Sequence, residues 1–200
     1  MQTIRSIGFD RPIIIIHPGE YHSCGSDSII STLLGSCVAV ALCDPVRQVG
    51  GMNHFMLPGK IGNADIYQTD SGKYGINAME LLINAILKRG GRKEAFVAKV
   101  FGGGAILPVS PMRKTNIAQD NIAFAFRFLE TEGIKTLSYD VGGTMARKIL
   151  LFPDSGRVLV RRVKGSLVQP ISSEETGYLA RLRKKIGTQG DFISFVDTPP

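Results

Sequence analysis

Two apolar runs, residues 36–43 and 48–57, constrain the fold of this chain more than any other feature. Asp44 and Pro45 lie between them, and these residue types suit the first and second positions of a tight turn. Apolar segments on either side of such a turn are typical of a β-hairpin. We therefore predict that the two runs pair as antiparallel strands.

The register of this hairpin decides which side chains meet. With Pro45 and Val46 as the two central turn residues, Cys37 falls directly opposite His54. Directly opposed residues share a face, with Cβ atoms about 4.5–5.5 Å apart. A thiol and an imidazole at that distance form the pair that activates a cysteine nucleophile. The alternative is a half-buried hairpin with a small core cysteine and a hydrogen-bonded histidine, and a longer turn would shift the register.

The rest of the chain mixes strands with two helices. Apolar positions at three- and four-residue steps, closed by glycine, predict helices over 73–88 and 117–132. Short apolar runs between turn residues predict further strands over 11–17, 28–34, 96–101, 136–140, 147–152 and 157–163. The mixture of hairpins and a strand–helix–strand unit predicts an α/β fold, a single-domain layered sandwich with a mixed β-sheet core and flanking helices.

Composition narrows the class of protein. The chain has 200 residues, of which 44% are apolar and 20% charged, as expected for one globular domain. No apolar run approaches the roughly 18–20 residues of a membrane span, and the N-terminal pattern does not match a signal peptide. Three cysteines without CxxC spacing argue against a disulfide framework. We expect a cytoplasmic protein with no integral membrane segment.

The net charge of +7 is concentrated partly near the C-terminus, at Arg181, Arg183, Lys184 and Lys185. A basic segment favours acidic partners, although it is more often a solvated face. No nucleic-acid-binding module is recognisable, so we expect no nucleic acid partner. We predict a domain over residues 1–170 and a basic C-terminal appendage over 171–200, with a short helix at about 174–186, that is not a separate domain.

The ordered motifs of the chain resemble the chemoreceptor glutamine deamidases of the CheD family. The resemblance rests on the residue types and spacing of segments 34–40, 44–45, 51–58, 99–105, 116–121, 140–143 and 156–163. It implies an α/β layered sandwich and a protein-glutamine glutaminase, a cysteine-dependent amidohydrolase that releases ammonia. Its substrates would be glutamines on the cytoplasmic helices of methyl-accepting chemoreceptors in bacterial chemotaxis. The resemblance also implies the phosphatase CheC as a partner.

The resemblance assigns Cys37 as the nucleophile and His54 as the acid and base. In the family a threonine six residues before the cysteine orients the histidine. Ser31 holds that position here, whereas Thr32 lies five residues before Cys37. We predict Ser31 as the third catalytic residue, because even spacing favours the Cys37 face of an extended chain, and keep Thr32 as the alternative.

Other residues suggest accessory roles or rival chemistry. Backbone N–H groups around Gly35 and Ser36 are candidates for stabilising an oxyanion. His17, His22 and Cys24 offer too few ligands at recognisable spacing for a metal site, so we expect neither a metal nor a cofactor. The rival functions are a non-catalytic adaptor that binds receptors or CheC, and a cysteine protease or transglutaminase.

Overall fold

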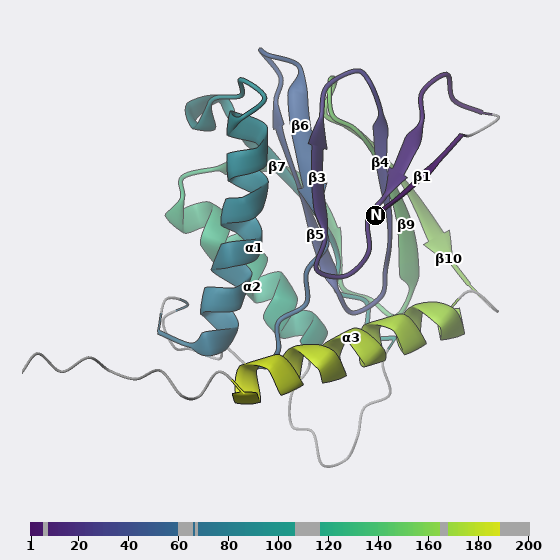
Figure 1. Ribbon diagram of the computed structural model, residues 1–200, viewed down its shortest axis with the longest axis vertical. Helices are drawn as coiled ribbons and strands as arrows, with labels where there is room; N and C mark the ends of the chain where they lie inside the picture. Colours follow the sequence, from purple (N-terminus) through teal and green to yellow (C-terminus); the bar gives the residue numbers. More distant parts are fainter. Residues whose placement is uncertain (6–7, 60–65, 67, 107–116, 165–167, 189–200) are drawn as a thin grey trace, which may run out of the picture.

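The computed structural model describes residues 1–5, 8–59, 66, 68–106, 117–164 and 168–188. Two five-stranded sheets and three α-helices make up an α/β fold (Figure 1). The predicted α/β class and mixed strand pairing are confirmed, although the strands divide between two sheets. Among the described residues no helix is long and apolar enough to cross a membrane.

The first sheet has the strand order β1-β2-β4-β9-β10. Its members are β1 (Gln2–Ile4), β2 (Ile13–Ile15), β4 (Ile29–Leu34), β9 (Ala146–Phe152) and β10 (Arg157–Val163). β2 pairs with β4 in parallel, and the other pairs are antiparallel. The strands predicted over 147–152 and 157–163 are therefore present and pair as a hairpin.

The second sheet has the strand order β3-β6-β5-β7-β8. Its members are β3 (Tyr21–Cys24), β6 (Val49–Asn53), β5 (Val38–Asp44), β7 (Val97–Gly102) and β8 (Lys135–Val141). β7 and β8 are parallel and are joined through α2 (Ile117–Thr131), which confirms the predicted strand–helix–strand unit. All seven residues of β5 are buried, since both faces of this strand are covered.

Side chains of β5 alternate between two apolar clusters. Val38, Val40 and Leu42 pack against α2 and α1 (Asp70–Leu87), which cover one face of the second sheet. Ala39 and Ala41 face the other way, into the cluster between the two sheets. A strand buried on both faces reads as a continuous apolar run, as residues 38–43 do.

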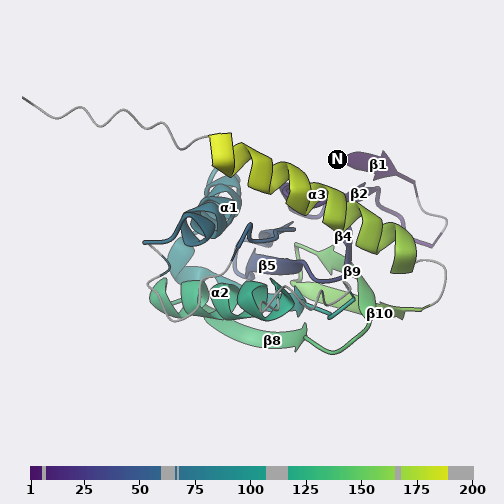
Figure 2. The same cartoon turned by 90° about the horizontal axis from the view of Figure 1, so that it is seen from below.

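The third helix, α3 (Val168–Thr188), lies across the ends of both sheets. Figure 2 shows it running from beside β9 and β10 to α1. It begins six residues before the predicted helix, and its buried residues Ile171, Glu175, Leu179 and Leu182 follow helical spacing. The remainder of the predicted appendage, residues 189–200, lies outside the described part of the chain.

The predicted hairpin register is wrong by two residues. Cys43 pairs with Gly50 and Asp44 with Val49, so the turn contains four residues rather than two. The Asp44 carboxylate explains this turn, because its Oδ1 accepts hydrogen bonds from the backbone N–H groups of Val46 and Arg47, each 3.0 Å long. The same register continues to the bridge between Val38 and Phe55. Successive side chains of a strand point to opposite faces of the sheet, so a shift of two residues leaves each side chain on its predicted face.

Candidate active site

The loop between β4 and β5, residues 35–37, is held through its carbonyl groups by a glycine turn at the end of β7. The Cys37 carbonyl accepts a 2.7 Å hydrogen bond from Gly103 N–H, and the Gly35 carbonyl accepts a 2.6 Å bond from Gly104 N–H. Gly102 has φ of 110°, and a Cβ there would lie 2.2 Å from the Cys37 carbonyl oxygen. Only glycine fits so close an approach at positive φ. This glycine turn thus positions the loop that carries Cys37.

Asn121 on α2 fastens the middle of this loop. Its Nδ2 donates a 2.9 Å hydrogen bond to the Ser36 carbonyl, while its Oδ1 accepts a 2.8 Å bond from Leu57 N–H. Asn121 is fully buried, so both ends of the amide are used where water cannot replace them. The residue therefore ties the loop that carries Cys37 to the segment that follows His54.

The N–H groups of the same loop converge on the opposite side, on one carboxylate. Glu175 Oε1 accepts hydrogen bonds from Gly35 N–H at 2.8 Å and Cys37 N–H at 3.1 Å. Glu175 Oε2 accepts from Ser36 N–H at 2.8 Å and from the Ser36 hydroxyl at 2.7 Å. Consecutive N–H groups that point at one centre form an anion-binding concavity. We call the N–H groups of Gly35, Ser36 and Cys37 the amide cradle.

His54 is oriented by Thr32 on β4. Thr32 Oγ1 lies 2.8 Å from His54 Nδ1 and also donates a 2.8 Å hydrogen bond to the Ile16 carbonyl. A hydroxyl has a single proton, and the Ile16 carbonyl can only accept, so Thr32 must accept from His54 Nδ1–H. The neutral imidazole then carries its lone pair on Nε2. His54 Nε2 is buried and has no hydrogen-bond partner among the described residues, which leaves it available to accept a proton.

The thiol of Cys37 lies close to His54 and Glu175. The ligand-forming atoms of Cys37, His54 and Glu175 all lie within 4.8 Å of one another. Cys37 is 0% exposed and His54 is 2% exposed. The sequence-based expectation that these two side chains meet therefore agrees with the structure in geometry.

The electrostatic setting favours the neutral forms of both side chains. Burial, reinforced by the nearby Glu175 carboxylate, raises the pKa of the Cys37 thiol well above its usual value. Burial, with a contribution from His17, lowers the pKa of His54 to about 3. A charged pair of Cys37 thiolate and His54 imidazolium is therefore not the favoured state while Glu175 and the surrounding residues bury the site.

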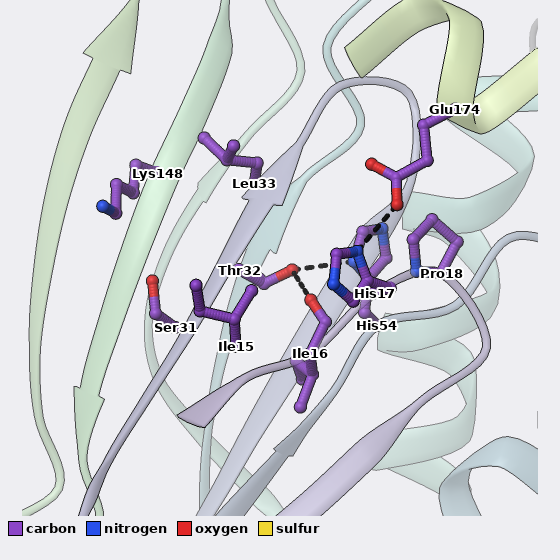
Figure 3. Close-up of a pocket in the computed structure, with 10 residues that line it drawn as sticks. All are labelled: Ile15, Ile16, His17, Pro18, Ser31, Thr32, Leu33, His54, Lys148 and Glu174. Atoms are coloured by element: carbon purple, nitrogen blue, oxygen red, sulfur yellow. Dashed lines mark hydrogen bonds and ion pairs between the residues drawn. The ribbon is translucent and has the colours of Figure 1, made fainter. Parts of the chain in front are cut away.

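The third residue beside the imidazole is Thr32, the alternative, rather than Ser31. In Figure 3 the Thr32 hydroxyl points to His54, and Ser31 points away from it. Ser31 was predicted because an even number of residues separates it from Cys37 on an extended chain. The chain is not extended throughout, because β4 ends at Leu34 and the loop around Gly35 precedes Cys37. The predicted role of Ser31 loses its geometric basis.

Sequence reasoning missed three residues that shape the site. Glu175 lies in the C-terminal segment that was predicted only to be basic. It is far from residues 35–37 in the sequence, so no sequence pattern indicates that it contacts them. Asn121 lies in segment 116–121, one of the segments that resemble the family, but helical periodicity predicts only that it is buried. Arg147 is 1% exposed, and its Nη1 donates a 2.8 Å hydrogen bond to the Gly102 carbonyl. An arginine at the start of a strand gives no sequence signal of such a role.

The three clustered side chains are also a metal-ligand set. Among the described residues, Cys37, His54 and Glu175 are the group of histidine, cysteine and acidic residues close enough to share an ion. Zinc accepts thiolate, imidazole and carboxylate ligands, but four ligands are usual at a structural site. Both Glu175 oxygens already accept hydrogen bonds from the loop, so the carboxylate is satisfied without a metal. His17, by contrast, pairs with Glu174 at 2.8 Å.

Comparison with known proteins identifies the family. A family model described as "CheD chemotactic sensory transduction" matches residues 56–162. A protein of Burkholderia thailandensis named "Probable chemoreceptor glutamine deamidase CheD 2" is 41% identical over 188 residues, covering 94% of this chain and 95% of that protein. A similarly named Shewanella oneidensis protein, "CheD 1", is 42% identical and covers 94% of this chain and 89% of its own length. A Hydrogenovibrio crunogenus relative is 44% identical over 90% of this chain and 92% of its own length. The chain therefore belongs to the CheD family.

Proposed function

We propose that this protein is a protein-glutamine deamidase that converts glutamine to glutamate on methyl-accepting chemoreceptors in the bacterial cytoplasm. The names of its relatives, chemoreceptor glutamine deamidases, support the substrate class. The observation that carries the chemistry is the state of the His54 imidazole, which is grouped with the Cys37 thiol. Thr32 holds its Nδ1, and its Nε2 has no hydrogen-bond partner among the described residues. A buried imidazole with a fixed tautomer and a free lone pair is what a general base requires.

The first half of the reaction forms a thioester. His54 Nε2 takes the Cys37 thiol proton as sulfur attacks the δ-carbon of the substrate glutamine, and the carbonyl π electrons move onto oxygen. The amide cradle donates hydrogen bonds to that oxyanion, and one such donor is typically worth about 2.7–4 kcal/mol. The His54 imidazolium then protonates the departing nitrogen. The C–N bond breaks, and ammonia leaves.

The second half hydrolyses the thioester. The neutral His54 takes a proton from water, and the resulting hydroxide attacks the same carbon. The C–S bond breaks as the tetrahedral intermediate collapses, and His54 returns the proton to sulfur. The product is a glutamate side chain with one oxygen from water.

A non-catalytic adaptor for receptors or CheC is the alternative from another class. An adaptor needs neither a nucleophile nor a tautomer-controlled base, so the Thr32–His54–Cys37 arrangement favours the enzyme. We retain CheC as a proposed partner because the family resemblance implies it. A protease or transglutaminase shares the thioester step but differs in the bond cleaved or the acceptor used.

The test is incubation of the protein with a cytoplasmic receptor fragment, followed by weighing its glutamine-containing peptides and measuring released ammonia. Each deamidation adds about one dalton. We expect equal numbers of converted glutamines and released ammonia molecules, with neither formed by a folded Cys37→Ala variant. Receptor binding without conversion would favour the adaptor, and peptide-bond cleavage would favour a protease.

A further inference from the structure

The Glu175 carboxylate occupies the position that the proposed reaction needs for its oxyanion. It accepts hydrogen bonds from all three N–H groups of the amide cradle and from the Ser36 hydroxyl, at 2.7–3.1 Å. Glu175 is 1% exposed, so water does not share these donors. With Glu175 in place, no substrate oxygen can reach the cradle.

Glu175 also has the chemical form of the product. Deamidation leaves a carboxylate on a two-methylene side chain, and Glu175 is that side chain presented from a helix. Its carboxylate lies in the group of Cys37 and His54 atoms within 4.8 Å of one another, where a newly formed glutamate would be released.

α3 holds Glu175 there through contacts on successive turns. Ile171, Leu179 and Leu182 are buried on the Glu175 face. Glu174 pairs with His17 at 2.8 Å at the mouth of the pocket that reaches His54 (Figure 3). The Tyr178 hydroxyl bonds to that of Tyr74 on α1.

The far end of the helix is tied as well, by a 2.9 Å hydrogen bond from Arg183 Nε to the Pro58 carbonyl. α3 adds Leu179 to the apolar cluster between the two sheets and Ile171 to a small cluster with Ala146 and Val163, whereas α1 and α2 contribute many buried side chains to the main cluster. An element held by few buried apolar side chains and several polar contacts can open without global unfolding.

We infer that α3 is an internal product mimic that lies on the substrate-docking surface, and that it must leave for catalysis. The surface beneath it accepts an incoming helix that presents a glutamine side chain to Cys37, as α3 presents Glu175. This inference rests on the proposed deamidase function. The burial that opposes ionisation of Cys37 and His54 is a property of the covered site and is relieved when α3 moves away.

The first experiment measures access to Cys37 without any substrate, so it does not depend on the proposed function. Glu175→Ala removes the carboxylate from the cradle, and Glu174→Gln is the matched control because it removes one negative charge from the adjacent, half-exposed position. We expect alkylation of Cys37 by iodoacetamide, followed by peptide mass, to be about tenfold faster or more in Glu175→Ala, since a set of charge-assisted hydrogen bonds is lost. Glu174→Gln should stay within about twofold to threefold of the parent.

The second experiment measures turnover of a receptor fragment, which distinguishes a Glu175 that mimics the product from a Glu175 that takes part in catalysis. Removing a competitor should raise kcat/KM on a receptor fragment in Glu175→Ala by lowering KM. Unchanged alkylation, or a lower kcat in a folded Glu175→Ala protein, would overturn the inference and make Glu175 part of the working site. Absence of receptor turnover in the parent would instead contradict the proposed function.

A second variant, Glu175→Gln, applies if Glu175→Ala does not fold. It turns the internal product into an internal substrate, so Cys37 should convert the introduced glutamine back to glutamate within the protein, with a gain of about one dalton in that peptide. The double variant Cys37→Ala with Glu175→Gln should keep its introduced glutamine. If the introduced side chain stays unconverted in Glu175→Gln protein that still deamidates a receptor fragment, position 175 does not occupy the product's place.

Discussion

Thr32 Oγ1 and His54 Nδ1 lie 2.8 Å apart, and this contact fixes which nitrogen of the imidazole is free to act. The threonine proton goes to the Ile16 carbonyl, so the histidine must donate from Nδ1. The lone pair on Nε2 follows from these two hydrogen bonds. Thr32 is thus a positioning residue that acts through His54.

Thr32→Val should lower kcat on a receptor fragment by about tenfold to a hundredfold, because His54 loses both its orientation and its tautomer preference. Thr32→Ser keeps the hydroxyl and should recover most of the activity. Ser31→Ala should have a smaller effect than Thr32→Val. Steady-state kinetics of the three folded variants give the order, and a larger loss for Ser31→Ala would return the third role to Ser31.

Much of the fold was predictable because it depends on local periodicity and turn chemistry. The β5–β6 hairpin and the β7–α2–β8 unit follow from apolar runs, glycines and helical spacing. The short strands β1 and β3 escaped prediction, since three or four residues of mixed polarity give no clear period.

The details of the site depended on contacts that sequence spacing does not report. The Asp44 side chain builds a longer turn than the Asp-Pro pair alone suggests, which moved the register. The Glu175 contact with Gly35 spans 140 positions. Cys37 and His54 were predictable because the hairpin pattern brings them close together and the family resemblance assigns the same pair, whereas Thr32 required the geometry of the loop at Gly35.

The buried neutral His54 makes the stability of the protein sensitive to acid. Its pKa of about 3 in the folded state lies below the value of 6.5 expected for an unfolded chain. Between these values the unfolded state binds more protons, so the free energy of unfolding falls as pH falls, by at most about 1.4 kcal/mol per pH unit for this group. The full contribution is present above about pH 6.5.

Denaturant unfolding at several values between about pH 7 and pH 5 measures this effect. A His54→Gln variant lacks the titrating group and should show a shallower decline than the parent. His22, whose pKa is also lowered, is present in both proteins and does not affect the comparison. Identical slopes for parent and variant would contradict a neutral, buried His54.

Asn121 should matter for both stability and turnover. Asn121→Ala leaves the Ser36 carbonyl and Leu57 N–H without their partner, which typically costs about 1–3 kcal/mol for each buried group. We expect a lower melting temperature and a lower kcat, because the loop that carries Cys37 loses its tie to α2. Gln119→Ala, on the exposed side of the same helix, is the control and should change neither. Equal effects of the two substitutions would mean that Asn121 does not position the loop.

The most direct measurement of the central claim is the reaction of a receptor fragment in water enriched in ¹⁸O. Hydrolysis of a Cys37 thioester places one water oxygen in each new glutamate, so each converted peptide should gain about three daltons rather than one. The parent protein should give this shift at a rate that Cys37→Ala does not reach. A receptor fragment whose glutamines remain unlabelled and unconverted, or are converted equally fast by Cys37→Ala, would contradict the account.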